Sequence, residues 1–178
     1  MRNIVFATNN KNKLVEVQDI LEKEFIVLSL KDINCLEELK ETHDTLEDNA
    51  SEKAFYIFDK YSMNCFADDS GLEIEALKGK PGVLSARYAG DKKCSSDNIK
   101  KVLKEMQGKP NRKAKFRTVI SLIINGGEKQ FEGFINGTIL KESRGKEGFG
   151  YDSIFQPDGF DVSFAEMTLQ EKNKISCL

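Results

Sequence analysis

The sequence predicts an α/β protein with a mixed β-sheet and flanking helices. Short apolar runs in the first third of the chain alternate with segments whose apolar residues repeat at helical spacing. Farther along, two stretches of alternating apolar and polar residues flank an Asn-Gly-Gly sequence, which is typical of a long β-hairpin. Strands that alternate with helices and are followed by a hairpin indicate one mixed α/β sheet.

Apolar periodicity defines the expected elements of the first half. They are a strand over residues 3–8, a helix over 12–23, a strand over 25–30, a helix that begins near Asp44 and a strand over 64–68. Asp44 followed by Glu47 resembles a capping box at the start of the second helix, whose apolar face runs from Leu46 to Tyr61. The stretch that precedes this helix is charged and irregular.

The second half begins with a predicted helix from Ser95, which offers an N-cap, to Gly108, which offers a stop. The hairpin follows over residues 113–140, with the Asn-Gly-Gly sequence as its turn. A last helix is expected to begin at Thr168, because a capping-box glutamate stands three residues later.

Composition excludes several classes of protein. The 178 residues carry 27 Lys and Arg against 29 Asp and Glu, a net charge of −2, which argues against a dedicated binder of nucleic acid. No apolar run is long enough to span a membrane, and the N-terminus lacks a signal-peptide pattern. An apolar fraction of 39% is enough for a core. We expect a single domain over residues 1–178, built as one body or as two tightly joined lobes.

Four cysteines and one histidine limit the chemistry further. The cysteines are scattered at positions 35, 65, 94 and 177, so they form neither a zinc motif nor a disulfide framework. His43 lies in a polar stretch and is expected to be an ordinary surface residue. A lone histidine also weakens any Ser-His-Asp or Cys-His mechanism. We therefore expect reduced cysteines and a cytoplasmic protein.

The first candidate site is the polar segment between the first strand and the first helix. It comprises Thr8, Asn9, Asn10, Lys11, Asn12 and Lys13. Backbone N–H groups at a helix N-terminus bind anions, and side-chain donors and two lysines are added here. The segment is not a Walker loop, because the glycine pattern of that loop is absent. Phosphate binding and an ordinary polar βα turn both remain open.

The second candidate site is the pair Asp68 and Asp69, at the end of the expected strand over 64–68. Adjacent strand residues point to opposite faces, so we expect one carboxylate to face a ligand and the other to face the scaffold. One carboxylate is sufficient for Mg²⁺, which takes its other ligands from water and phosphates. Glu41, in an acidic stretch, could add another. The alternative is a simple Asp-Ser-Gly turn at Ser70.

The third candidate site is the glycine-rich segment over residues 147–155. Phe149 lies between two glycines, and such a loop can bring an aromatic face close to a nucleobase. The alternative is a glycine-rich entry into a strand with core aromatics. In the predicted last helix, Lys172 is expected, from the residues alone, to be solvated.

These segments, in this order, resemble the inosine triphosphate pyrophosphatase family, the non-standard purine nucleotide pyrophosphatases. The resemblance covers residues 4–176, and the segments that carry it are FATNNKNKLVEV, ETHDTLEDNA, FADDSGLEIEALKGKPGVLSARYAG, EGFGYDSIF and EMTLQEKNKIS. It implies an elongated α/β fold with a central cleft, dependence on Mg²⁺ and a homodimer. The implied reaction is hydrolysis of ITP, dITP and XTP to the monophosphate and pyrophosphate, which cleanses the nucleotide pool.

The resemblance also implies roles for individual residues. Asp69 would bind Mg²⁺ and accept the proton of the attacking water, with Asp68 beside it and Glu41 as a further metal ligand. The implied substrate contacts are Thr8, Asn9, Asn10, Lys11, Asn12, Lys13, Ser70, Phe149, Gly150, Tyr151, Asp152 and Lys172. Among these, Lys13 is the main cation for the triphosphate and Phe149 stacks on the base. The chemistry is consistent with these roles, because a triphosphate needs positive charge around it before water can attack.

The end of the chain departs from the family. After EKNKIS the family continues with His-Arg and a closing helix, whereas this chain reads Cys177-Leu178. Neither residue can donate the paired hydrogen bonds that an arginine offers to a purine oxygen. We therefore expect a shortened last helix and weaker discrimination of ITP from ATP or GTP than in a longer relative. Equal ITP/GTP ratios of kcat/KM in the two would contradict this expectation.

Two other functions compete with the pyrophosphatase. A nucleotide-binding protein with little or no turnover would follow from the missing base-recognition segment. A phosphatase with an aspartyl nucleophile is opposed by the contiguous aspartates, since such enzymes use a spaced Asp-x-Asp. Measuring pyrophosphate release from ITP with and without EDTA tests the binding protein without turnover. Orthophosphate as the first product would support the phosphatase.

Overall fold

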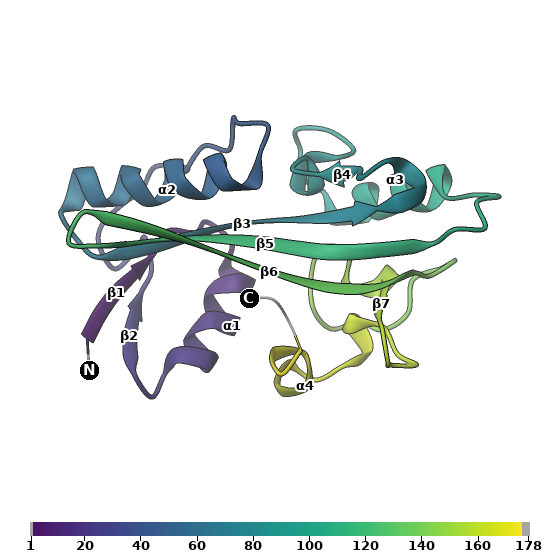
Figure 1. Cartoon of the computed structure of the whole chain (residues 1–178). Helices are drawn as coiled ribbons and strands as arrows, with labels where there is room; N and C mark the ends of the chain where they lie inside the picture. The colour runs from purple at the N-terminus through teal and green to yellow at the C-terminus, as the bar shows by residue number, and fades with distance from the viewer. Residues whose placement is uncertain (1, 176–178) are drawn as a thin grey trace. The chain divides into compact units, whose positions relative to one another are not determined.

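The structure, a computed structural model, describes residues 2–175 and contains a mixed seven-stranded sheet with helices packed on it (Figure 1). The strands are β1 (Arg2–Phe6), β2 (Phe25–Leu28), β3 (Cys65–Ile74), β4 (Pro81–Gly82), β5 (Lys113–Ile124), β6 (Gly127–Ile139) and β7 (Phe155–Pro157). The α-helices are α1 (Lys11–Leu21), α2 (Leu46–Tyr61), α3 (Ser95–Glu105) and α4 (Leu169–Asn173). Short 3₁₀ helices lie at Glu75–Leu77, Ser85–Arg87, Asp152–Ile154 and Phe164–Glu166.

The strand order is β2-β1-β3-β5-β6-β7, with β4 paired to β3. β1 runs parallel to both β2 and β3, whereas β4 is antiparallel to β3 and β7 is antiparallel to β6. The predicted fold class, a mixed α/β sheet with flanking helices and a long hairpin, is therefore confirmed. The expectation for Cys177 and Leu178 lies outside the described residues.

The described residues divide into two compact units. Residues 2–69 and 118–133 form the first unit, and residues 70–117 and 134–175 form the second. The long strands β3, β5 and β6 each contribute residues to both units. Among residues 2–175, no helix is long and apolar enough to cross a membrane.

The first unit packs apolar side chains against both faces of β1 and β3. Cys65 and Ala67 pack with residues of α2, whereas Phe66 packs with residues of α1. These helices lie on opposite sides of the sheet (Figure 1). Because strand side chains alternate, the same alternation sends Asp68 to the α1 side and Asp69 to the α2 side. The expectation that the two carboxylates face opposite ways is confirmed by their partners, described below.

The helix starts differ slightly from those predicted. The N-cap of α2 is Thr45, whose hydroxyl accepts a hydrogen bond from the Asp48 N–H at 3.1 Å, so the predicted cap at Asp44 is wrong by one residue. The N-cap of α3 is Cys94, and its side chain makes no capping bond, so the predicted Ser95 cap is also wrong. For the last helix, the Thr168 capping box is confirmed.

Strand β3 is longer than predicted. The sequence suggested that the chain turns at Ser70 and Gly71, but β3 continues through both residues to Ile74. A Cβ atom on Gly71 would lie 2.5 Å from the carbonyl oxygen of Gly82 in β4. The glycine therefore allows a neighbouring strand to approach closely, which is the other common reason for a glycine inside a strand. Ser70 is a half-buried strand residue rather than part of a turn.

The β5–β6 hairpin is confirmed. Asn125 and Gly126 join the strands with φ values of +52° and +84°. Two consecutive residues with positive φ are the mark of the two-residue hairpin turns that favour Asn-Gly.

Buried polar contacts centred on Ser85 connect several elements of the second unit. The Ser85 hydroxyl accepts a hydrogen bond from the Leu72 N–H at 2.9 Å and donates one to the Gly82 carbonyl at 2.6 Å. The Ser85 carbonyl accepts a bond from the Tyr151 hydroxyl at 2.8 Å. Asn98 of α3 holds the same loop, accepting from the Ala89 N–H at 2.7 Å. These bonds attach the 82–89 loop to β3, α3 and the Tyr151 segment.

Candidate active site

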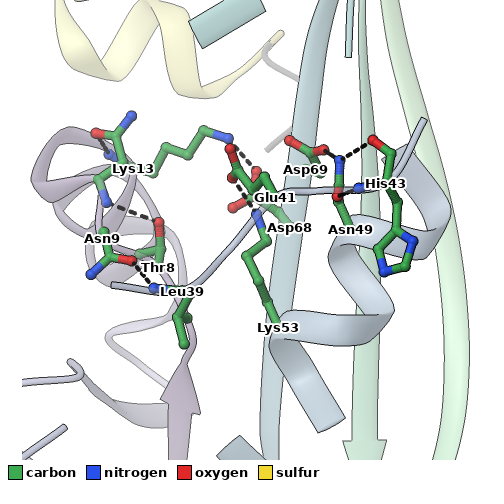
Figure 2. A network of polar contacts seen from close by, with 11 residues as sticks. Thr8, Asn9, Lys13, Leu39, Glu41, His43, Asn49, Lys53, Asp68 and Asp69 are labelled. Atoms are coloured by element: carbon green, nitrogen blue, oxygen red, sulfur yellow. Dashed lines mark hydrogen bonds and ion pairs between the residues drawn. The ribbon is translucent and has the colours of Figure 1, made fainter. Parts of the chain in front are cut away.

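The turn between β1 and α1 is organised by its own side chains. Asn10 caps α1, because its Oδ1 accepts hydrogen bonds from the N–H groups of Asn12 at 2.9 Å and Lys13 at 3.3 Å. Thr8 Oγ1 accepts a bond from the Asn10 N–H at 3.1 Å (Figure 2). Two of the N–H groups that the sequence offered to an anion, those of Asn12 and Lys13, are thus engaged by Asn10 in this structure. Lys11 and Asn12 are exposed on the first turn of the helix.

Lys13 forms an ion pair with Asp68. The Lys13 side chain is 14% exposed and that of Asp68 is 1% exposed, so water screens the pair weakly. Burial alone would lower the pKa of Lys13, but Asp68, helped by Asp69 and Glu41, outweighs burial and the pKa of Lys13 is raised. Lys13 is therefore a firmly protonated cation beside two aspartates.

Asp69 lies on the other face of β3 and contacts α2. Its Oδ2 accepts a hydrogen bond from Asn49 Nδ2 at 2.8 Å (Figure 2). Burial raises the pKa of Asp69 to about 6, and Glu41 adds to the rise. Lys53, Asn49 and Lys13 act in the opposite direction without cancelling it. The ionised form of Asp69 is therefore held at a cost, which a bound cation would reduce.

A third carboxylate comes from the irregular segment between β2 and α2. Glu41 accepts a hydrogen bond from Lys53 Nζ at 2.7 Å, and the Lys53 side chain is 7% exposed. The segment is anchored to the β1–α1 turn because Asn9 Oδ1 accepts a bond from the Leu39 N–H at 2.9 Å. Glu41 also acts electrostatically on Lys13 and on Asp69, raising the pKa of each, and Figure 2 shows its label beside those of the two aspartates. The structure thus brings Glu41 into one cluster with the Asp68 and Asp69 pair.

Asn49 and Lys53 belong to this cluster and were missed by sequence reasoning. Both are buried on α2, at 0% and 6% exposure. They stand four residues apart on the same helix face as the apolar stripe that contains Ala50 and Ala54. Polar residues that occupy positions of a buried stripe were the available signal, because a buried polar group needs a partner.

The donor set fits one kind of metal site and not another. No group of three or more His, Cys, Asp or Glu side chains within residues 2–175 is arranged to hold a metal by itself. Mg²⁺, however, commonly takes one or two carboxylates and completes its shell with water and substrate phosphates. Asp69, Asp68 and Glu41 supply hard oxygen ligands of that type next to Lys13 and Lys53. The residues present therefore fit Mg²⁺ that binds together with a phosphate ligand.

A second cluster lies in the second unit and joins Phe149, Asp152 and Lys172. Asp152 Oδ2 accepts hydrogen bonds from the Phe149 N–H at 2.8 Å and from Lys172 Nζ at 2.8 Å. Lys172 Nζ also stands 4.4 Å from the centroid of the Phe149 ring. The expectation of a solvated Lys172 is wrong, since its side chain is 8% exposed and paired with a buried carboxylate. Lys172 thus holds the loop through Asp152 and lies over one face of the Phe149 ring.

Glycines give the Phe149 loop its conformation. Gly148 has φ +74°, and a Cβ atom there would lie 2.2 Å from Asp152 Oδ2. Gly150 has φ +59°, with nothing within 4 Å of the corresponding Cβ position. Tyr151 is buried and packs in the core, as the alternative interpretation of this segment predicted for its aromatic residues. Phe149, in contrast, is only half-buried. Substrate contacts by residues 149–152 stay a prediction.

The fold and the first cluster define a mixed α/β protein that gathers lysines and carboxylates beyond the carboxyl end of β1, beside the middle of the parallel strand β3. The chain belongs to the Ham1 family, whose model matches residues 4–177. This match confirms the family expectation.

Relatives and solved structures agree with this assignment. A protein from Flavobacterium psychrophilum named dITP/XTP pyrophosphatase is 51% identical over 173 residues, which is 97% of this chain and 91% of that protein. A protein of the same name from Porphyromonas gingivalis is 50% identical, over 99% of this chain and 91% of the relative. The Ham1 protein of Coxiella burnetii superposes with a TM-score of 0.89 at 37% identity, covering 99% of this chain and 92% of that chain. The Ham1 protein of Staphylococcus aureus gives 0.87 at 35% identity, with the same two coverages.

Proposed function

We propose that this protein hydrolyses non-standard purine nucleoside triphosphates, namely ITP, dITP and XTP, to the monophosphate and pyrophosphate. The observation that carries the proposal is the buried Lys13–Asp68 pair beside Asp69, where β1 ends before the N-terminus of α1 and the parallel strand β3 continues past it. Such strand ends are the usual ligand sites of α/β sheets. The printed names of the relatives from Flavobacterium and Porphyromonas supply the substrate class.

The first cluster suits the triphosphate. Lys13, with Lys11 and the polar groups from Thr8 to Asn12, supplies positive charge and donors for phosphate oxygens. Asp69, supported by Asp68 and Glu41, would hold Mg²⁺. When bound, this ion neutralises phosphate charge and makes the phosphorus easier to attack. These residues together would orient the triphosphate while Lys13 and Lys53 offset its charge.

Asp69 is also the proposed proton acceptor for the attacking water. Burial raises the pKa of Asp69 to about 6, so its carboxylate is ionised at neutral pH, which is the form that can accept a proton. Its Oδ2 is held by Asn49, so the carboxylate has a fixed orientation. Water attack at the α-phosphorus, with pyrophosphate as the leaving group, completes the proposed reaction.

The second cluster suits a purine base. Lys172 covers one face of the Phe149 ring, and a base would stack on the other, for about 1–3 kcal/mol. Gly150, Tyr151 and Asp152 would contact the nucleotide through their part of the loop, and Ser70 from β3. The alternative function, nucleotide binding without turnover, is not favoured, because the relatives compared are named as pyrophosphatases.

The remaining expectations are proposals of the same kind. We expect one pyrophosphatase domain over residues 1–178 that acts as a homodimer in the cytoplasm. Within the described residues, Cys35, Cys65 and Cys94 are free thiols, in keeping with a reducing compartment.

A nucleotide panel tests the proposed function. The protein would be incubated with ITP, XTP, dITP, GTP and ATP, with Mg²⁺ or with EDTA, and the products separated chromatographically. We expect the monophosphate and pyrophosphate from the first three substrates, with Mg²⁺ only. Orthophosphate as the first product, or no product from any substrate, would refute the proposal.

A further inference from the structure

Asn49 makes hydrogen bonds in two directions from a fully buried position. Its Nδ2 donates to Asp69 Oδ2 at 2.8 Å and to the His43 carbonyl at 3.4 Å. Its Oδ1 accepts from the His43 N–H at 2.9 Å. The residue is 0% exposed and its bond to Asp69 is buried, so water competes little for that bond, whereas the two bonds to His43 are partly buried.

The first set of contacts fixes a carboxylate. A hydrogen bond to one oxygen of Asp69 restricts rotation of the carboxylate plane, and the other oxygen points away from Asn49, toward the side where Lys13 lies (Figure 2). Groups that bind a metal or take up a proton depend on such orienting bonds.

The second set of contacts fixes a segment of chain. Bonds to both the N–H and the carbonyl of His43 hold the backbone two residues after Glu41 against α2. The other end of this segment is held by the Asn9–Leu39 bond at 2.9 Å. Glu41 therefore stands between two asparagine anchors, and its position relative to Asp69 is set by Asn49.

We propose that Asn49 is a positioning residue that orients the Asp69 carboxylate and sets the register of the Glu41 segment for the reaction. The inference rests on the proposed function. An amide is the side chain that can do both, because it offers a donor to Asp69 and an acceptor to the His43 N–H from one plane. An aspartate at this position keeps the acceptor but faces Asp69 with a second carboxylate oxygen at a 2.8 Å spacing.

Asn98 provides a matched control in the second unit. It is also buried, at 4% exposure, and its amide likewise accepts from one backbone N–H and donates to backbone carbonyls, those of Ala86 at 3.0 Å and Ser85 at 3.4 Å. It therefore shares the structural part of the Asn49 arrangement but contacts no carboxylate in those bonds. Asn98→Asp reports the effect of losing a buried structural asparagine.

The first experiment measures kcat and KM for XTP in Asn49→Asp, Asn49→Ser, Asn98→Asp and the unaltered protein. We expect kcat to fall by about 10- to 100-fold in both Asn49 variants with a much smaller change in KM, as for other residues that orient metal ligands. Asn98→Asp should leave kcat nearly unchanged. Equal losses at the two asparagines, or a normal kcat in Asn49→Ser, would overturn the inference.

The second experiment needs no turnover and uses the metal-free protein. Asn49→Asp should lower the midpoint of thermal unfolding, because it brings two carboxylates together. The exchanged pair Asn49→Asp/Asp69→Asn restores an amide–carboxylate bond, so its midpoint should exceed the value expected from the sum of the two single changes, whereas the changes in Asn98→Asp/Asp69→Asn should simply add. If the shift in midpoint of the exchanged pair equalled the sum of the shifts of its two single variants, residues 49 and 69 would not interact, and the inference would be wrong. If the unaltered protein releases no pyrophosphate, the proposed function fails while this second result still stands.

Discussion

Asp69→Asn should make the metal-free protein more stable even as it removes activity. Asp69 is 6% exposed, and its burial raises its pKa from an ordinary 3.8 to about 6. A shift of about two pKa units corresponds to about 3 kcal/mol at about 1.4 kcal/mol per unit. An asparagine copies the protonated carboxyl imperfectly, so we expect a gain of about 1–3 kcal/mol in the free energy of unfolding at about pH 8.

The sign of the pH dependence follows from the direction of this shift. Because the folded-state pKa of Asp69 lies above its unfolded value, the carboxyl costs nothing below about pH 4, where it is protonated in both states. The cost grows as the pH rises through about 6 and then levels off. The stability advantage of Asp69→Asn should therefore be small near pH 4, increase toward pH 7 and stay constant above it.

Urea unfolding in EDTA, followed by circular dichroism at several pH values, measures this difference. Asn49 can keep a hydrogen bond to the new amide, since the asparagine at position 69 can turn its carbonyl oxygen toward it. Lower stability of Asp69→Asn than of the unaltered protein at pH 8 would show that the buried Asp69 carboxylate does not destabilise the fold. A stability difference that did not change between pH 4.5 and pH 7.5 would show that the pKa of Asp69 is not raised.

Three further predictions concern the glycines of the Phe149 loop, the Lys172–Asp152 pair and the thiols. Gly148→Ala should lower the free energy of unfolding by about 1–3 kcal/mol, because φ is +74° and the added Cβ would collide with the Asp152 carboxylate. The loss should be larger than in Gly150→Ala, whose added Cβ meets no atom within 4 Å, and chemical denaturation of the two variants measures the difference. Lys172→Met leaves the buried Asp152 carboxylate without its cation and should lower the free energy of unfolding by about 3–5 kcal/mol, measured the same way. A loss smaller than that caused by the same change at an exposed lysine would contradict the buried ion pair. Burial raises the pKa of the Cys65 thiol to about 12, so this thiol should react slowly at pH 8. In the native protein, iodoacetamide should label the more exposed Cys94 well before Cys65, which mass spectrometry of peptides would measure.

Local patterns predicted most elements of the fold. Helical spacing located α1, α2 and α3 to within a few residues, and the Asn125-Gly126 pair located the hairpin turn. The alternation of strand side chains also predicted that Asp68 and Asp69 face opposite ways, which their bonds to Lys13 and Asn49 confirm. These features depend on neighbours in sequence, so the sequence alone contains the necessary information.

Features that depend on distant partners were not predictable in the same way. Gly71 could equally mark a turn or a close strand approach, and only the position of Gly82 decides between them. Lys172 is buried in a pair with Asp152, which lies 20 residues earlier at the start of a 3₁₀ helix. Asn49 likewise bonds a carboxylate 20 residues away, so its role required the sheet and the helix to be placed first.

Asp69 is the carboxylate that the proposed reaction requires, and removing its charge is the sharpest measurement of that role. Pyrophosphate release from XTP would be measured at saturating Mg²⁺ for the unaltered protein and for Asp69→Asn, after both are shown to be folded. We expect kcat to fall by about 10²–10⁴-fold in the variant, in a protein that is at least as stable as the original. A variant that kept its turnover would show that the Asp69 carboxylate is not required for the reaction.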